Sequence, residues 1–265
     1  MGLIAQPLPA LGTRRETAEA SWARSLAPTL GDFFFVALLI WLFAGGAYGW
    51  LGLLGDGDTG WHIRTGEYVL DNGRVPATDL FSFTKPGQTW YAWEWLADVV
   101  FAWLFRLAGL KGVVLMAGVL ISATAFVVFR AMLWHGANPL AAMVVCLLGV
   151  SASSVHYLAR PHIFTLLLMA VSVWLLARDR RAPTRWVWAL IPVTAVWTNL
   201  HGGFVALIAT IGLLVAGSVA EAFLVGRERG ARLGAARRYA VLGAGCVAAS
   251  LLNPYGYHLQ VHLVT

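Results

Sequence analysis

Two acidic residues, Asp56 and Asp58, lie in a glycine-rich segment directly after the first long apolar stretch of the chain. The carboxylates of such a tight turn can face one ligand. That ligand is either a divalent cation, Mg²⁺ or Mn²⁺, which prefers hard oxygen ligands, or an acceptor hydroxyl that one carboxylate deprotonates as a general base. The competing interpretation is a solvated turn, because Asp and Gly are ordinary turn residues.

More polar groups follow close by and after later apolar stretches: His62, Arg64, Arg160, His162 and His201. A guanidinium suits phosphate through its paired donors, and a histidine can donate to the same phosphate or transfer protons. The alternatives are an arginine that contacts lipid phosphate generically and histidines that hydrogen-bond helix ends. A zinc site made of the three histidines has no compact ligand spacing to support it.

A third feature is the aromatic run that surrounds Glu94, with Trp90, Tyr91, Trp93 and Trp95 on either side of it. One interpretation is a belt of rings at the membrane interface. The other is a platform for a sugar or a lipid headgroup, with Glu94 as a binding residue.

The elements that must position these residues are membrane helices. The hydrophobic share is 59% and the charged share 12%, whereas soluble chains are about a quarter charged. A spanning helix needs about 20 mainly apolar residues. The pattern predicts an all-α membrane protein with about seven spans: Phe33–Leu54, Val113–Leu133, Leu140–Leu158, Ile163–Ala177, Trp186–Asn199, Phe204–Val225 and Tyr239–Leu252.

Two interfacial helices are expected between the first two spans. Thr59 can cap a short helix over Gly60–Asp71, which Asn72 and Gly73 would end. The stretch Trp93–Leu110 is apolar but interrupted by three charged residues, which would be costly in lipid. It is therefore predicted to be an amphipathic helix at the surface.

Basic residues predict the orientation, because cytoplasmic loops are enriched in Lys and Arg. With residues 1–30 as a cytoplasmic tail and 31–265 as the membrane domain, 13 of the 19 basic residues are cytoplasmic. They are Arg14, Arg15, Arg24, Arg130, Arg178, Arg180, Arg181, Arg185, Arg227, Arg229, Arg232, Arg237 and Arg238. The other six are Arg64, Arg74, Lys85, Arg106, Lys111 and Arg160. This placement indicates the bacterial inner membrane, a periplasmic loop over 55–111, and lipid rather than nucleic acid as partner.

The loop motifs resemble a known class of proteins. A catalytic acid just beyond the first span, in a long outer loop, is similar to the GT-C class of polytopic glycosyltransferases. The motifs also resemble a group of bacterial multi-pass proteins. The residues that form these motifs are Asp56, Asp58, Trp61, His62; Gly73, Pro76, Asp79, Phe81, Ser82, Phe83; Trp90, Glu94, Trp95; Arg160, Pro161, His162; Asn199, Leu200, His201, Gly202, Gly203; and Asn253, Pro254, Tyr255, Gly256.

The resemblance implies a polyprenyl-phosphate-linked sugar donor and transfer on the outer face to a lipid, glycan or protein. Asp58 would deprotonate or position the acceptor, and Asp56 would assist it or bind a cation. His62, Arg64, Glu94, Arg160, His162 and His201 would bind the donor. GT-C proteins usually have more spans and often a soluble C-terminal domain, so a chain ending at Thr265 is expected to be a fragment or a shortened relative.

Two other functions remain open on the sequence. One is a transporter of lipid-linked sugars, which would need polar residues near the middle of the membrane, where the predicted spans carry few ionisable groups. The other is a non-catalytic membrane partner in the assembly of envelope glycans.

Overall fold

Helices make up all the regular elements of the described residues in the computed structural model, which are 28–45, 48–224 and 228–264. In chain order they are α2 (Leu30–Ala44), η1 (Gly49–Leu54), α3 (Asp58–Asn72), α4 (Trp95–Trp134), α5 (Pro139–Ser153), η2 (Ser154–His156), α6 (His162–Arg181), η3 (Arg185–Ala189), α7 (Leu190–Leu200), α8 (Phe204–Leu224), α9 (Arg229–Ser250) and α10 (His258–Val264), with η for 3-10 helices. The predicted all-α class is confirmed. Of the predicted tail 1–30, residues 1–27 lie outside the described ranges.

Four helical stretches are long and apolar enough to cross a membrane: α4, α5 together with η2, α6 and α8. The helix α2 is apolar but shorter. Large apolar side chains point outward from these helices, such as Leu148, which is 66% exposed, and Leu213, which is 74% exposed. Such surfaces are stable in a lipid environment and support the membrane class that the composition predicts.

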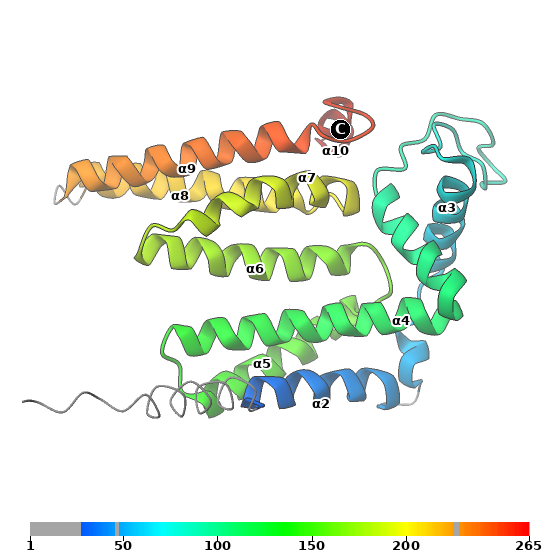
Figure 1. Ribbon diagram of the computed structural model, residues 1–265, viewed down its shortest axis with the longest axis horizontal. Coiled ribbons are helices and arrows are strands. Elements are labelled where there is room, and N and C mark those ends of the chain that lie inside the picture. The colour runs from blue at the N-terminus through cyan, green and yellow to red at the C-terminus, as the bar shows by residue number, and fades with distance from the viewer. Residues whose placement is uncertain (1–27, 46–47, 225–227, 265) are drawn as a thin grey trace, which may run out of the picture.

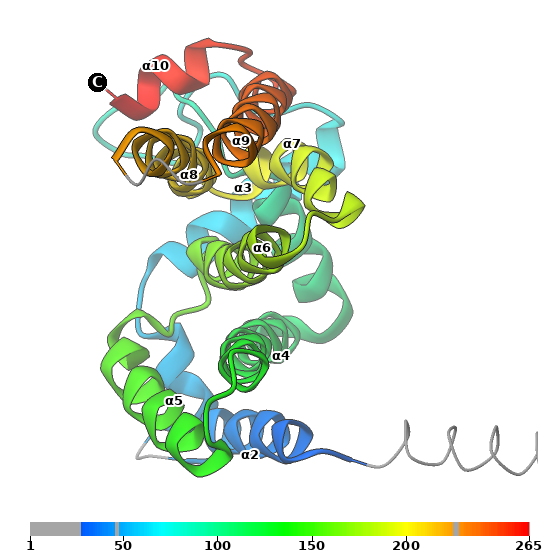
Figure 2. The ribbon, with the colours of Figure 1, turned by 90° about the vertical axis from the view of Figure 1, so that its left-hand side faces the viewer.

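The long helices lie side by side, as Figure 1 shows. Viewed along the bundle in Figure 2, α2, α4 and α5 form one group, α7, α8 and α9 form another, and α6 lies between them. Each group has its own core, one around Ile121 and Phe129 and the other around Trp197 and Leu242. Residues of α6 belong to both cores, so this helix joins the two groups.

Connecting segments meet at the two ends of the bundle. At the end that carries α3, which we call the α3 end, Trp95 Nε1 donates to Asn199 Oδ1 at 2.8 Å, and Asn199 Nδ2 donates to the carbonyl oxygen of Leu252 at 2.9 Å. At the other end, which we call the arginine end, Arg238 binds Asp179. The turns after predicted spans one, three, five and seven thus gather at the α3 end.

Three predicted spans differ from the helices observed. The helix α2 ends at Ala44 and a separate 3-10 helix follows, so the stretch to Leu54 is not one helix. The stretch Trp186–Asn199 is divided between η3 and α7. The helix α9 begins at Arg229, ten residues before the predicted span, because charged residues can form helix as readily as apolar ones.

The stretch Trp93–Leu110 is not a separate surface helix. Residues from Trp95 onward form the first part of α4, which bends at Ala108 and Gly109 before it enters the bundle. Gly109 has φ +63, a left-handed conformation that glycine adopts without strain. This first part packs against α3, with Gly66 so close to it that an added Cβ would lie 1.9 Å from the carbonyl oxygen of Asp98.

The predicted cap of α3 is wrong. The helix begins at Asp58, and its N-cap residue Gly57 has no side-chain hydrogen bond. Thr59 instead donates its hydroxyl to the carbonyl oxygen of Ala159 at 3.0 Å, so a tertiary contact has replaced the local one. The predicted end is confirmed, because Gly73 follows Asn72 with φ +64. The bond from Thr59 holds the start of α3 against the segment that carries Arg160.

Candidate functional site

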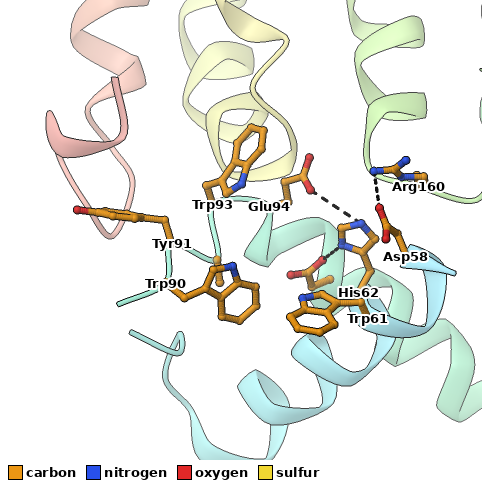
Figure 3. A pocket seen from close by; sticks show the side chains of 10 residues that line it. Asp58, Trp61, His62, Trp90, Tyr91, Trp93, Glu94 and Arg160 are labelled. Carbon is orange, nitrogen blue, oxygen red and sulfur yellow. Dashed lines mark hydrogen bonds and ion pairs between the residues drawn. The ribbon is translucent and has the colours of Figure 1, made fainter. Parts of the chain in front are cut away.

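A polar pocket of about 230 Å³ lies at the α3 end (Figure 3). Its volume is below the range of roughly 300–1,000 Å³ typical of drug-sized ligands, so it suits a small group such as one sugar ring. The residues that line it are Asp58, Trp61, His62, Trp90, Tyr91, Ala92, Trp93, Glu94, Asp98 and Arg160. They come from α3, the segment 90–94, the start of α4 and the turn before α6.

Arg160 joins the two acids that follow η1. One of its terminal nitrogens lies 2.9 Å from Asp56 Oδ2, and the other lies 2.6 Å from Asp58 Oδ2. The N–H of Asp58 also donates to Asp56 Oδ1 at 2.9 Å. This N–H, more than the nearby guanidinium, holds the pKa of Asp56 below its usual range. Both acids thus contact one cation, the guanidinium of Arg160.

That arrangement does not favour the divalent cation considered as one possible ligand of Asp56 and Asp58. The guanidinium already lies between Asp56 and Asp58 and would repel a divalent cation there. Among the described residues, no group of three or more His, Cys, Asp or Glu side chains is placed to hold a metal ion. We therefore derive no step through a metal at these acids.

Beside this cluster, His62 and Asp98 form a buried pair. His62 Nδ1 lies 2.7 Å from Asp98 Oδ1, and the two residues are 8% and 3% exposed. Burial lowers the pKa of His62, but the hydrogen bond and charge of Asp98 outweigh it, so the pKa is raised overall. With Nδ1–H donating to Asp98, the other ring nitrogen is directed towards Glu94, as Figure 3 shows. A carboxylate that orients a histidine in this way is a frequent feature of acid–base sites.

Glu94 stands between two histidines. Its carboxylate oxygens lie 3.9 Å from His62 Nε2 and 3.6 Å from His201 Nε2. Burial raises the pKa of Glu94 to about 7, because the loss of water outweighs the attraction of His62. A carboxyl group with this pKa gains and loses its proton near neutral pH, which suits proton transfer.

His201 has a fixed tautomer. Its Nδ1 accepts a hydrogen bond from the N–H of Gly203 at 3.0 Å and lies 2.9 Å from the hydroxyl of Thr165. The ring proton therefore sits on Nε2, which faces Glu94. Burial, together with the positive charges of neighbouring residues, lowers the pKa of His201 to about 4. His201 therefore faces Glu94 with its Nε2–H, at 3.6 Å and without a direct hydrogen bond.

Aromatic rings form the rest of the pocket wall. Trp61 packs edge-on against Phe81 and Trp90, with ring centroids 5.4 and 5.7 Å apart. Trp93 packs on Gly202, where an added Cβ would lie 2.6 Å from the indole ring. The absence of a side chain at Gly202 therefore allows the backbone to approach the indole closely. Indole faces can pack on the C–H groups of a sugar, and the neighbouring carboxylates can accept hydrogen bonds from its hydroxyls.

The residues proposed from sequence are not all at the pocket. Asp58, His62, Glu94 and Arg160 line it, and Asp56 and His201 contact lining residues. Arg64 is on the exposed side of α3, where it pairs with Glu67 three residues further along the helix. His162 Nε2 lies 2.6 Å from the carbonyl oxygen of His156, and its ring is 6.5 Å from that of His201. These positions do not support a zinc site formed by three histidines.

Asp98 is the site residue that the sequence argument did not single out. Asp98 is one of the three charged residues that interrupt the apolar stretch Trp93–Leu110. Its spacing carried the signal, because Asp98 follows Glu94 by four residues and so lies on the same face of a helix.

Comparison with known proteins adds no relative, since no family model, curated protein or solved structure matches the chain. The argument for function therefore rests on the geometry of this pocket.

Proposed function

We propose that the chain is a GT-C-like membrane glycosyltransferase that takes a sugar from a polyprenyl-phosphate donor. The main observation behind this proposal is that two groups line one pocket. They are the guanidinium of Arg160, which is paired with acids, and the hydrogen-bonded pair of His62 and Asp98. The first group suits the phosphate of a donor, and the second suits the hydroxyl of an acceptor. The neighbouring apolar helices suit a lipid-linked substrate.

Arg160 is the proposed phosphate-binding residue. A guanidinium has five N–H donors, and the ion pairs with Asp56 and Asp58 engage only its two terminal nitrogens, one bond each. The remaining donors can bind the phosphate oxygens. The two acids fix the orientation of the guanidinium before the donor arrives, which lowers the entropic cost of binding.

The proposed proton acceptor is the pair formed by His62 and Glu94. Their facing atoms are 3.9 Å apart, too far for a direct hydrogen bond, and an acceptor hydroxyl placed beside them can reach either. In the proposed step the hydroxyl oxygen bonds to the anomeric carbon of the sugar and its proton passes to this pair. The bond from the anomeric carbon to the phosphate oxygen breaks, and the phosphate leaves with the electron pair, beside Arg160.

Asp58 has a different role in this proposal from the one the sequence suggested. Its carboxylate lies 2.6 Å from Arg160, so it is already engaged by the guanidinium. Asp58 and Asp56 therefore position Arg160, and the base is His62 with Glu94.

We also propose seven passes through a bacterial inner membrane, with the α3 end in the periplasm and the arginine end in the cytoplasm. The concentration of arginines in residues 178–185 and 228–238 supports this orientation. Single cysteines placed at Arg74 and at Arg180 test it, in a chain whose two buried cysteines, Cys146 and Cys246, are replaced by alanine. In intact cells, a membrane-impermeant maleimide should label the cysteine at 74 alone. Labelling at 180 without permeabilisation would reverse the orientation.

The activity is tested with the purified chain in proteoliposomes that contain a polyprenyl-phosphate sugar. Arg160→Ala should raise the KM for the donor roughly tenfold to a hundredfold, since a hydrogen bond to a charged group contributes about 1.5–3 kcal/mol. The matched control is Arg106→Ala, which removes another arginine that pairs with an acid, Asp71, at the α3 end but outside the pocket. An equal effect of both variants would contradict the assignment of Arg160.

The same preparation separates the proposed activity from transport. A transferase releases polyprenyl phosphate and forms a new glycoside. Movement of the intact lipid-linked sugar between the leaflets, with no release of polyprenyl phosphate, would instead indicate a transporter and would overturn the proposal.

A further inference from the structure

A second polar cavity, of about 460 Å³, lies at the arginine end between α6, α8 and α9. It is separate from the α3-end pocket and plays no part in the proposed reaction. Its lining includes Arg180, Ser218, Glu221, Arg232, Gly234 and Arg238.

The arginines of this cavity differ in how they are paired. Arg238 binds both carboxylate oxygens of Asp179 at 2.9 Å, and the side chain of Asp179 is 1% exposed. This bidentate pair neutralises itself and connects α9 with the end of α6. Its role is structural, so it contributes little net charge to the cavity.

Arg180 and Arg232 share a single acid. Glu221 lies 3.5 Å from a terminal nitrogen of Arg180 and also pairs with Arg232. Two guanidiniums against one carboxylate leave a net positive charge. The three side chains come from α6, α8 and α9 and are each 37–50% exposed, so the pairs are accessible to a ligand in the cavity.

Small residues leave room for that ligand. No atom lies within 4 Å of the position that a Cβ on Gly234 would take, and Ser218, Ala231 and Ala235 also line the cavity. The sequence around it, residues 178–185 and 221–238, has nine arginines and three acids. Basic pockets between membrane helices at the cytoplasmic surface are suited to anionic lipid headgroups.

We propose that this cavity binds the phosphate headgroup of an anionic phospholipid through Arg180 and Arg232. Glu221 holds the two guanidiniums towards the cavity when the lipid is absent and competes with the phosphate for them. The acyl chains lie along the apolar surface of α8, where Leu213 and Leu224 are exposed. The lipid thus joins α6, α8 and α9 at the arginine end.

The test is a titration of the purified full chain with dioleoylphosphatidylglycerol, followed by native mass spectrometry. The double variant Arg180→Ala/Arg232→Ala should raise the Kd roughly tenfold or more, because charge-assisted bonds to phosphate are lost. The matched control is Arg185→Ala/Arg237→Ala, which removes two arginines from the same end that do not line the cavity. This control should leave the Kd within about twofold, since exposed charges contribute little. Equal weakening in both double variants would mean generic attraction to a basic surface, and would overturn the proposal.

Glu221→Gln gives an independent test in the opposite direction. Removing the competing carboxylate should lower the Kd for phosphatidylglycerol severalfold, whereas loss of fold would raise it; circular dichroism checks the helix content of each variant. Unchanged or weaker binding by a folded Glu221→Gln chain would refute the site.

Phosphatidylcholine and inorganic phosphate are the ligand controls. Displacement of the lipid by inorganic phosphate at equal concentration would assign the cavity to free phosphate instead.

Discussion

His62→Asn is expected to slow sugar transfer by about a hundred- to ten-thousand-fold, the usual cost of losing a general base. The Nδ2 of asparagine takes nearly the place of the histidine Nδ1, so it can still donate to Asp98 across the present 2.7 Å. The ring nitrogen that faces Glu94 is lost. The substitution therefore removes the proton acceptor and keeps the buried hydrogen bond. The measurement is the initial rate of transfer in proteoliposomes, with the thermal midpoint of unfolding recorded in parallel.

Asp58→Asn is the comparison that separates the two candidate bases. Because Asp56 still binds Arg160 in this variant, we expect a loss of only about tenfold, the value of one hydrogen bond to a charged group. A much larger loss for Asp58→Asn than for His62→Asn would return the base role to Asp58. Two near-normal rates would remove the case for acid–base catalysis in this pocket.

The membrane class and the positions of the loops could be predicted from the sequence because they depend on the average hydropathy and charge of whole segments. Runs of apolar residues and blocks of arginine are properties of whole segments, and the four long apolar helices agree with them. The limits of the shorter spans could not be predicted in this way. In α9, arginines and apolar residues continue one helix from Arg229 to Ser250, so hydropathy marks only part of it.

Asp58 and His62 follow the first predicted span, whereas Arg160 follows the third and His201 the fifth. Placing these three span ends on one side of the membrane is enough to bring the four residues to the same end of the bundle. Their individual bonds did not follow, because these depend on contacts between distant segments. The Thr59 hydroxyl was expected to cap its own helix, yet it bonds to Ala159, a hundred residues away. The guanidinium of Arg160 lies between Asp56 and Asp58, where a divalent cation was one of the ligands considered.

The face of α3 that packs on α4 could also have been predicted from the spacing of residues in the sequence. Thr59, His62, Ile63 and Gly66 are buried, and their spacing of three and four residues is that of one helix face. Placing Gly66 on the same face as His62 suggests that the glycine allows the close approach that the histidine needs to reach Asp98.

Gly66→Ala is accordingly expected to lower both stability and activity. Its new Cβ would lie 1.9 Å from the carbonyl oxygen of Asp98 and 2.8 Å from the Cβ of Ala102. The first obstacle is backbone and cannot rotate away, so α3 and α4 must separate. We expect a loss of about 3 kcal/mol in the free energy of unfolding, at the upper end of ordinary overpacking. Separation also draws His62 away from Asp98, so the transfer rate should fall as it does in His62→Asn.

Gly60→Ala is the matched control in the same helix. Nothing lies within 4 Å of the position that its Cβ would take, and alanine is favoured over glycine in a helix by about 0.5–1 kcal/mol. This variant should keep its activity and unfold at the same temperature or a higher one. If Gly66→Ala unfolds and reacts like Gly60→Ala, then α3 and α4 are not in the close contact that positions His62 against Asp98, and the proposed base loses its partner.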